Sequence, residues 1–334
     1  MKNILITGGA GFIGSHICLT LLQEGYFIYI VDSFINSKKN VFDGINKIVN
    51  LETKNKGEII KVFEGDIRSK CFLEFVFLEA SKIGKPIDGV IHLAGLKAAR
   101  ESNIKPLKYW DINVNGSINL FRVMDENNCR NILFSSSASI YSSSSQLPFK
   151  ESSLIKPTNP YAHTKYTVEC ILQNLINCSN KKWRVSILRY FNPVGAHPSG
   201  LIGEDPLGIP ENLFPLMCQV ASGFKEKLYI FGNDWPTLDG TCHRDYIHVV
   251  DLASFHKIAI ENLLFNRKIN FILNVGTGKS YSILELINTF EVINKVKINY
   301  HFTKRIEGDI AISFANTEKI LKDFNWAPKN NLED

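Results

Sequence analysis

Short apolar segments alternate with longer amphipathic segments along the first 190 residues of the chain. The apolar segments predict β-strands at residues 4–7, 27–31, 59–63, 90–93, 132–135 and 185–188. Helical periodicity separates them at residues 12–24, 107–127 and 161–177. Repeated strand–helix–strand units of this kind predict an α/β fold with a doubly wound parallel sheet of the Rossmann type.

The pattern changes after residue 190. Proline and glycine become dense over residues 192–210, and a long irregular stretch in a compact enzyme often forms a binding segment. Shorter apolar segments at residues 228–231, 271–275 and 298–301 predict a smaller α/β lobe beyond it. We therefore predict a large domain over residues 1–190 and a second lobe over residues 191–334.

Three glycines, Gly8, Gly11 and Gly14, follow the first predicted strand and open the first predicted helix. A strand that runs through a glycine turn into a helix is the fingerprint of a dinucleotide site. Gly8 permits the tight turn, Gly11 lets the backbone approach a pyrophosphate, and Gly14 lets the helix pack closely on the strand.

Asp32 ends the second predicted strand, at the place where an acidic residue is expected in such a site. Its carboxylate can accept hydrogen bonds from both hydroxyls of an adenosine ribose, and it would repel a 2′-phosphate. Asp32 therefore favours NAD over NADP. The alternative is a plain turn residue at a strand end.

Tyr161 and Lys165 share one face of a predicted helix, and a serine run that includes Ser137 ends a predicted strand upstream. A tyrosinate can take the hydroxyl proton of an alcohol whose C–H leaves as hydride. Lowering a tyrosine pKa from ~10 to neutrality takes about 4 kcal/mol, whereas an exposed ion pair supplies ~1 kcal/mol or less. A positive nicotinamide ring and a water-poor cleft must supply the rest. The alternative is a buried tyrosine beside a lysine that reaches to solvent.

Composition and charge argue against several classes of protein. The chain of 334 residues is 45% hydrophobic and 21% charged, and its net charge of +5 is spread without a basic run, so nucleic-acid binding is not expected. Seven cysteines without a CxxC motif indicate neither a disulfide framework nor a metal site. Because no apolar run is long enough to span a membrane and the first strand leaves no room for a signal peptide, we expect a cytoplasmic protein without membrane partners.

Several motifs together resemble the UDP-glucose 4-epimerases, also called UDP-galactose 4-epimerases, of the extended short-chain dehydrogenase/reductases. They are TGGAGFIG at 7–14, SSSASIY at 135–141, YAHTK at 161–165, RYFNPVGAHPSG at 189–200 and IFGNDWPT at 230–237. The resemblance covers residues 2 to 328 and implies a homodimer formed through the helices at 107–127 and 161–177.

The resemblance also implies a reaction, a role for each catalytic residue and a ligand for each domain. A tightly held NAD would be reduced and reoxidised in each turnover, and UDP-glucose and UDP-galactose would interconvert through a 4-keto sugar. Tyr161 would be the base, Lys165 would hold the ribose and lower the tyrosine pKa, and Ser137 would hydrogen-bond the 4-hydroxyl. The large domain would bind NAD, and the lobe over 191–334 would bind the UDP-sugar.

The resemblance assigns further residues to each ligand. The cofactor positions are Gly8, Gly11, Phe12, Ile13, Gly14, Asp32, Asn36, Ser37, Asp66, Ile67, Leu93, Ala94, Gly95, Lys97, Asn113, Ser135, Tyr161, Lys165, Tyr190 and Phe191. The substrate positions are Ser137, Tyr161, Asn192, Asn212, Leu213, Tyr229, Phe231, Arg244, Tyr246, Asp309 and Ser313.

The chain departs from the family pattern at particular places. Ile306 stands where an arginine that contacts the diphosphate is common, and Arg100 stands where a small residue is usual. Ser313 stands where members restricted to glucose and galactose often have a tyrosine, so UDP-GlcNAc and UDP-GalNAc become expected substrates. The family's last helix is largely missing after Asp334.

Two other classes remain as alternatives. A sibling nucleotide-sugar 4,6-dehydratase or decarboxylase is the first, but a dehydratase needs carboxylates where this chain has Ser137, Ala138 and Ser139. A non-catalytic dinucleotide-binding regulator is the second, and it would have no use for a serine, tyrosine and lysine set.

Overall fold

The computed structural model describes residues 2–52, 59–178, 182–208, 210, 212–265, 267, 270–306 and 308–334. Within these residues, the main sheet has seven parallel strands in the order β11-β6-β5-β4-β1-β2-β3. Their bounds are β1 Asn3–Thr7, β2 Phe27–Asp32, β3 Ile60–Glu64, β4 Gly89–His92, β5 Asn131–Ser137, β6 Arg184–Tyr190 and β11 Phe271–Val275. The strand order reverses between β1 and β4, where open α/β sheets bind their ligands.

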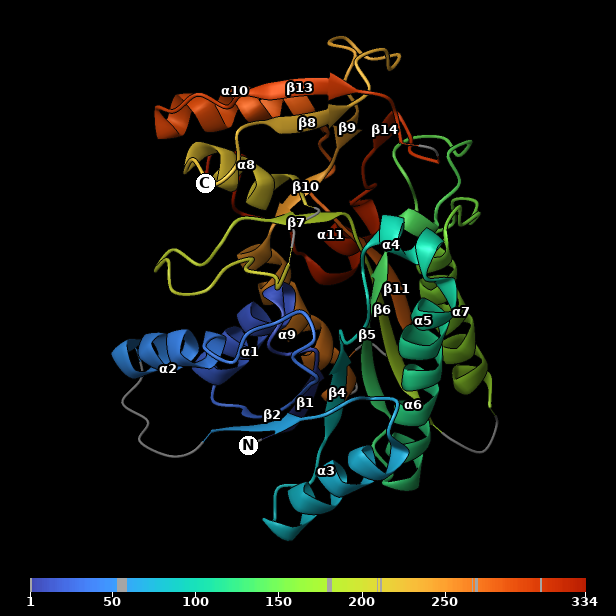
Figure 1. Ribbon diagram of the computed structural model, residues 1–334. Helices are drawn as coiled ribbons and strands as arrows, with labels where there is room; N and C mark the ends of the chain where they lie inside the picture. The colour runs from blue at the N-terminus through green and yellow to red at the C-terminus, as the bar shows by residue number, and fades with distance from the viewer. Residues whose placement is uncertain are drawn as a thin grey trace.

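Helices cover both faces of this sheet (Figure 1). On one face lie α1 Phe12–Gln23 and α9 Val249–Leu264, with α2 Val41–Glu52 packed against α1. On the other face lie α3 Lys70–Lys82, α6 Gly116–Glu126 and α7 Pro160–Asn177. Separate clusters of buried aliphatic and aromatic side chains fill the two interfaces. The predicted doubly wound Rossmann sheet is therefore confirmed.

The helix predicted at 107–127 is divided. Short helices α4 Ala99–Ile104 and α5 Pro106–Tyr109 come first, and a π-helical turn at Trp110–Asn115 joins α5 to α6. Pro106 is the first residue of α5, where its missing N–H costs nothing. Turns of this kind are frequent at functional sites, and this one carries the buried Asn113.

One predicted strand belongs to a different part of the molecule. The segment 271–275 was expected in the smaller lobe, but β11 pairs in parallel with β6 at the edge of the main sheet. The helix α9 precedes it and packs against α1, so 249–275 forms one more helix and strand of the large sheet. The predicted lobe over 191–334 is therefore interrupted by elements of the large domain.

The smaller lobe carries short sheets and two helices, drawn at the top of Figure 1. The strand predicted at 298–301 is found two residues later. The helices of the lobe are α8 Leu213–Ala221 and α10 Ile283–Asn294. One strand pair is β8 Leu228–Phe231 with β13 Tyr300–Thr303, and another is β7 Asn192–Val194 with β10 Tyr246–His248. A three-stranded sheet consists of β12 Tyr281–Ser282, β9 His243–Arg244 and β14 Ile312–Ser313. The last helix, α11 Glu318–Phe324, packs under the main sheet through Ile320.

Candidate active site

The glycine turn lies between β1 and α1. Gly8 has a φ of 75°, and a side chain on Gly14 would come within 2.3 Å of the Gly8 carbonyl oxygen. Both positions therefore require glycine. The N-cap of α1 is Gly11, whose lack of a side chain leaves the first helical N–H groups, at Phe12 and Ile13, facing outward without a side-chain cap. This end of the helix fits a pyrophosphate.

Asp32 lies at the end of β2 and is fixed by its neighbours. One carboxylate oxygen accepts a hydrogen bond from the Ala10 backbone N–H at 3.0 Å, and the other accepts from the Phe34 N–H and the Ser37 hydroxyl, both at 2.9 Å. The acid therefore contacts the glycine turn directly, in the position that the ribose of a dinucleotide needs. Asn36 is exposed beside it.

The predicted adenine contacts follow β3. Ile67 is buried and packs against Gly116. The Asp66 carboxylate forms an ion pair with Arg68 at 2.7 Å, and this pairing holds its pKa below the usual range. Arg68 also pairs with Asp111 at 2.6 Å.

The turn after β4 is held by Asn113. Its amide donates to the Leu96 carbonyl and accepts from the Leu96 N–H, at 3.0 and 2.8 Å, and it also bonds Thr164 on α7. The backbone of Leu93 and Ala94 bonds back to Thr7 on β1. Lys97 lies beyond Gly95 in this turn and pairs with Glu204 at 2.8 Å. Four predicted cofactor residues therefore line one turn beside the glycines, and Asn113 fixes its shape.

The predicted catalytic residues meet where β5 ends beside α7. The Lys165 ammonium donates to the Ser135 carbonyl oxygen at 2.8 Å, and the Tyr161 and Ser137 hydroxyls are hydrogen-bonded. The Ser139 hydroxyl donates to Ser137 at 2.9 Å. The helix begins with an N-cap, Asn159, followed by proline at its first position, so the first turn that carries Tyr161 is well defined.

Burial dominates the electrostatics of this group. It raises the pKa of the Tyr161 hydroxyl, and the hydrogen bond from Ser137 opposes the rise. Burial also lowers the pKa of Lys165 to about 8, with the Glu169 carboxylate opposing the decrease. Lys165 thus remains mostly protonated at neutral pH, and further positive charge is needed before Tyr161 can act as a base.

A buried ion pair beneath the site was missed by sequence reasoning. Arg189 on β6 forms two hydrogen bonds with Glu169 on α7, at 3.0 and 2.7 Å, and both side chains are 3% exposed. The Ser136 hydroxyl donates to the same carboxylate, and Arg189 donates to the Tyr141 hydroxyl at 3.0 Å. Glu169 lies four residues after Lys165, and this spacing was the available signal.

Tyr190 and Phe191 close the base of the site. Because Nδ1 of His256 donates to the Leu252 carbonyl at 2.8 Å, its Nε2 accepts from the Tyr190 hydroxyl. Phe191 packs in a cluster that contains Phe149. Tyr190 therefore connects the carboxyl end of β6 to α9.

The predicted substrate residues of the smaller lobe divide into two groups. Arg244 forms an ion pair with Asp309, and the backbone of Arg244 lies opposite that of Ser313 in the β9–β14 pair. Asn192 donates to the Asp245 carbonyl at 2.8 Å and lies opposite Tyr246. These residues form one contiguous group.

The second group consists of the exposed or partly exposed residues Asn212, Leu213, Tyr229 and Phe231. Asn212 donates to Glu204 at 2.6 Å, next to Leu213 at the start of α8. Tyr229 on β8 is 52% exposed, and Phe231 ends the same strand. Each residue is on an accessible part of the lobe.

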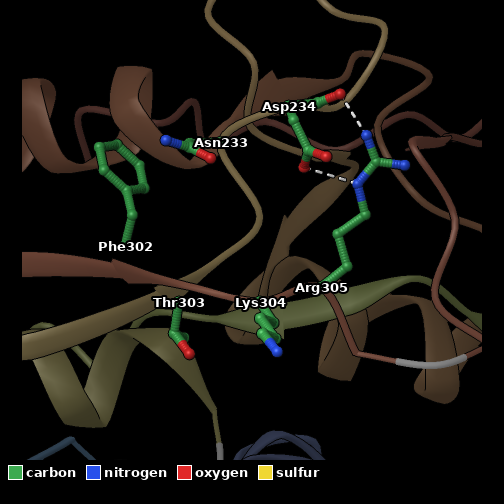
Figure 2. Close-up of a pocket in the computed structure, with 6 residues that line it drawn as sticks. All are labelled: Asn233, Asp234, Phe302, Thr303, Lys304 and Arg305. Atoms are coloured by element: carbon green, nitrogen blue, oxygen red, sulfur yellow. Dashed lines mark hydrogen bonds and ion pairs between the residues drawn. The ribbon is translucent and has the colours of Figure 1, made fainter.

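Arg305 has its own partners in the 233–239 loop (Figure 2). Its guanidinium bonds Asp234 at 2.7 Å and lies over the Trp235 ring at 4.2 Å. These contacts form one side of an open pocket that Phe302, Thr303 and Lys304 also line. Arg305 is therefore held by the 233–239 loop, and the neighbouring Ile306 carries no charge.

Comparisons with known proteins agree with this geometry. The family model described as NAD dependent epimerase/dehydratase family matches residues 4–276. A UDP-glucose 4-epimerase of Bacillus subtilis is 44% identical over 99% of this chain and 94% of that protein. Among the described residues, no helix has the length and apolar character required to cross a bilayer.

Two solved structures are similar over the whole chain. A UDP-glucose 4-epimerase from Bifidobacterium longum in complex with NAD+ and UDP is 40% identical, with a TM-score of 0.92 over 100% of this chain and 95% of that one. A UDP-Glc/GlcNAc 4-epimerase from Campylobacter jejuni is 30% identical, with a TM-score of 0.81 over 100% of this chain and 96% of that one.

Proposed function

This chain belongs to the NAD dependent epimerase/dehydratase family, and from that premise we propose that it is an NAD-dependent UDP-glucose 4-epimerase. It interconverts UDP-glucose and UDP-galactose by transient oxidation at C4 of the sugar. The observation that carries the proposal is the meeting of Tyr161, Ser137 and Lys165 where β5 ends, at the same carboxyl edge of the parallel sheet as the glycine turn after β1. The similar enzymes from Bacillus subtilis and Bifidobacterium longum support it.

The chain's own residues perform the proton chemistry. When bound, NAD would supply the hydride acceptor and donor for C4 of the sugar. Tyr161 takes the 4-hydroxyl proton on its Oη and later gives it back, while Ser137 orients the hydroxyl group. Lys165 is close enough to the end of β5 to hold a ribose there, and its charge favours the tyrosinate. The uncapped end of α1 and Asp32 hold the cofactor.

A simple assay tests the reaction. The purified protein is incubated with UDP-galactose, no cofactor is added, and the products are separated. UDP-glucose is the expected product, because a tightly held NAD is regenerated in every turnover. Loss of water or oxidation to an acid would instead favour a sibling nucleotide-sugar enzyme. An unchanged sugar would identify a non-catalytic regulator.

The proposal includes a cytoplasmic homodimer. The seven cysteines are all free, which fits a reducing compartment. Leu107 on α5 is 82% exposed, and Trp110 in the following turn is 38% exposed, on the helices expected to pair. Two copies of the α5–α6 segment and of α7 would bury these side chains in an interface like that of a four-helix bundle. Light scattering that gives a monomer mass would contradict the dimer.

Arg244 is expected to carry the contact with the diphosphate. Arg244→Ala should raise KM for the UDP-sugar by about 10–100-fold, since a hydrogen bond to a charged group contributes ~1.5–3 kcal/mol. The value of kcat should change little. Arg305→Ala is the comparison, because Asp234 and Trp235 hold Arg305. Steady-state kinetics on both variants would reverse the assignment if only Arg305→Ala raised KM.

Ser313 is expected to leave room for an N-acetyl group. It is buried, small and opposite Arg244, and the adjacent Phe314 is held by a bond from the Phe149 N–H to its carbonyl. The relative named for both UDP-Glc and UDP-GlcNAc supports a wider sugar range. Ser313→Tyr should reduce kcat/KM for UDP-GalNAc at least ~10-fold and leave UDP-galactose nearly unchanged. No turnover of UDP-GalNAc by the native protein, or no loss with tyrosine, would contradict this prediction.

A further inference from the structure

Arg100 connects the two parts of the molecule. It lies in the first turn of α4, next to the turn that follows β4 of the large sheet. Its guanidinium carbon lies 4.0 Å from the centroid of the Phe231 ring, at the end of β8 in the smaller lobe. In Figure 1, α4 is drawn at the upper end of the large domain, toward the smaller lobe. Arg100 therefore reaches a strand that carries two of the predicted substrate positions.

Cations near Arg100 are paired with carboxylates, whereas Arg100 has no such partner among the residues that the structure describes. Lys97 pairs with Glu204 at 2.8 Å, Arg244 with Asp309, and Arg305 with Asp234 at 2.7 Å. Over the described ranges, Arg100 has no carboxylate partner, and its side chain is exposed. Among these four cations near the substrate side, Arg100 is thus the one whose positive charge remains available to a ligand.

We propose that Arg100 binds the diphosphate of the nucleotide-sugar, using Phe231 as the platform that orients it. A guanidinium stacked flat on an aromatic ring keeps the N–H donors at its edge free, and these match the oxygens of a phosphate in a two-pronged contact. The inference rests on the proposed function, because it takes a nucleotide diphosphate to be the substrate's anionic part.

Charge balance supports the diphosphate as the ligand. A diphosphate diester carries two negative charges, while Arg244 is already compensated by Asp309. A second cation is therefore needed, and Ile306 supplies none. Phe231 is the last residue of β8, which pairs in parallel with β13 and also carries Tyr229, another predicted substrate position. Arg100 brings its charge to that end.

The experiment compares ligands that differ in phosphate content. Calorimetry measures the affinity of the NAD-loaded protein for UDP, UMP and uridine, with wild type, Arg100→Ala and Arg100→Met. Methionine keeps a long side chain over Phe231 but removes the charge. Arg267→Ala is the matched control, because Arg267 also lies over a phenylalanine, Phe265, at 5.8 Å. Arg267 precedes β11, at the amino ends of the parallel strands, whereas Arg100 follows β4 at their carboxyl ends.

Both Arg100 variants are expected to bind UDP about 10–100-fold more weakly than wild type and uridine about equally well. The Arg267→Ala variant is expected to bind both ligands normally. Unchanged UDP affinity in Arg100→Ala overturns the proposal. An equal loss for UDP and uridine, or full rescue by methionine, also overturns it, because Arg100 would then act by packing. Failure of the wild type to convert UDP-galactose contradicts the proposed function instead.

Discussion

Tyr161→Phe should lower kcat by about 10²–10⁴-fold and leave NAD bound, because it removes one positioned oxygen and nothing else. The Tyr161 hydroxyl is hydrogen-bonded to Ser137, and its helix also carries Lys165. The phenyl ring of the variant fills the same space, so the cofactor contacts of the glycine turn and Asp32 remain. Turnover is measured with UDP-galactose, and bound NAD by its release on denaturation.

A second tyrosine on the same helix provides the control. Tyr166 lies one residue after Lys165, and its hydroxyl interacts with Cys170 rather than with Ser137. Tyr166→Phe should therefore retain activity. A near-normal rate for Tyr161→Phe, or an equal loss in both variants, would contradict the role of Tyr161 as the base.

Arg189→Met should lower the free energy of unfolding by about 3–5 kcal/mol, because it leaves the Glu169 carboxylate buried without its partner. Both side chains are 3% exposed, and the pair connects β6 to the helix that carries Lys165. The loss is measured by urea unfolding of the NAD-loaded protein, with the cofactor concentration held constant.

Two further variants test whether the loss of stability in Arg189→Met comes from the buried ion pair. The double variant Glu169→Leu, Arg189→Met should recover much of the loss, since apolar side chains of similar size need no partner. Lys39→Met removes the exposed ion pair with Glu64 and should cost at most about 1 kcal/mol. A loss in Arg189→Met no larger than that of Lys39→Met would contradict the importance of the buried pair.

The sequence was most informative where local chemistry dictates the backbone. The glycines at 8, 11 and 14 each have a steric reason, and Asp32 lies where a strand ends beside them. The spacing of Tyr161 and Lys165 placed both on one face of α7, and the serine run placed Ser137 within reach. These features depend on neighbours along the chain, so they can be predicted without a structure.

The remaining features depend on residues far apart in the sequence. The partner of Glu169 is on β6, the ring under Arg100 is on β8, and β11 adds to the main sheet from beyond residue 270. The π-helical turn at 110–115 interrupts a pattern that otherwise favours one long helix. Periodicity reports which face of an element is buried, but it does not report which other element covers that face.

Because β11 comes long after β6 in the sequence, it affects how the chain folds during synthesis on the ribosome. The strands β1 to β6 are complete by residue 190, but the outer edge of β6 stays open until residues 271–275 have left the exit tunnel. An open edge presents unpaired N–H and C=O groups to any other nascent strand. Parallel pairing over such a separation is also slow. The growing chain is therefore exposed to association through that edge until β11 pairs with β6.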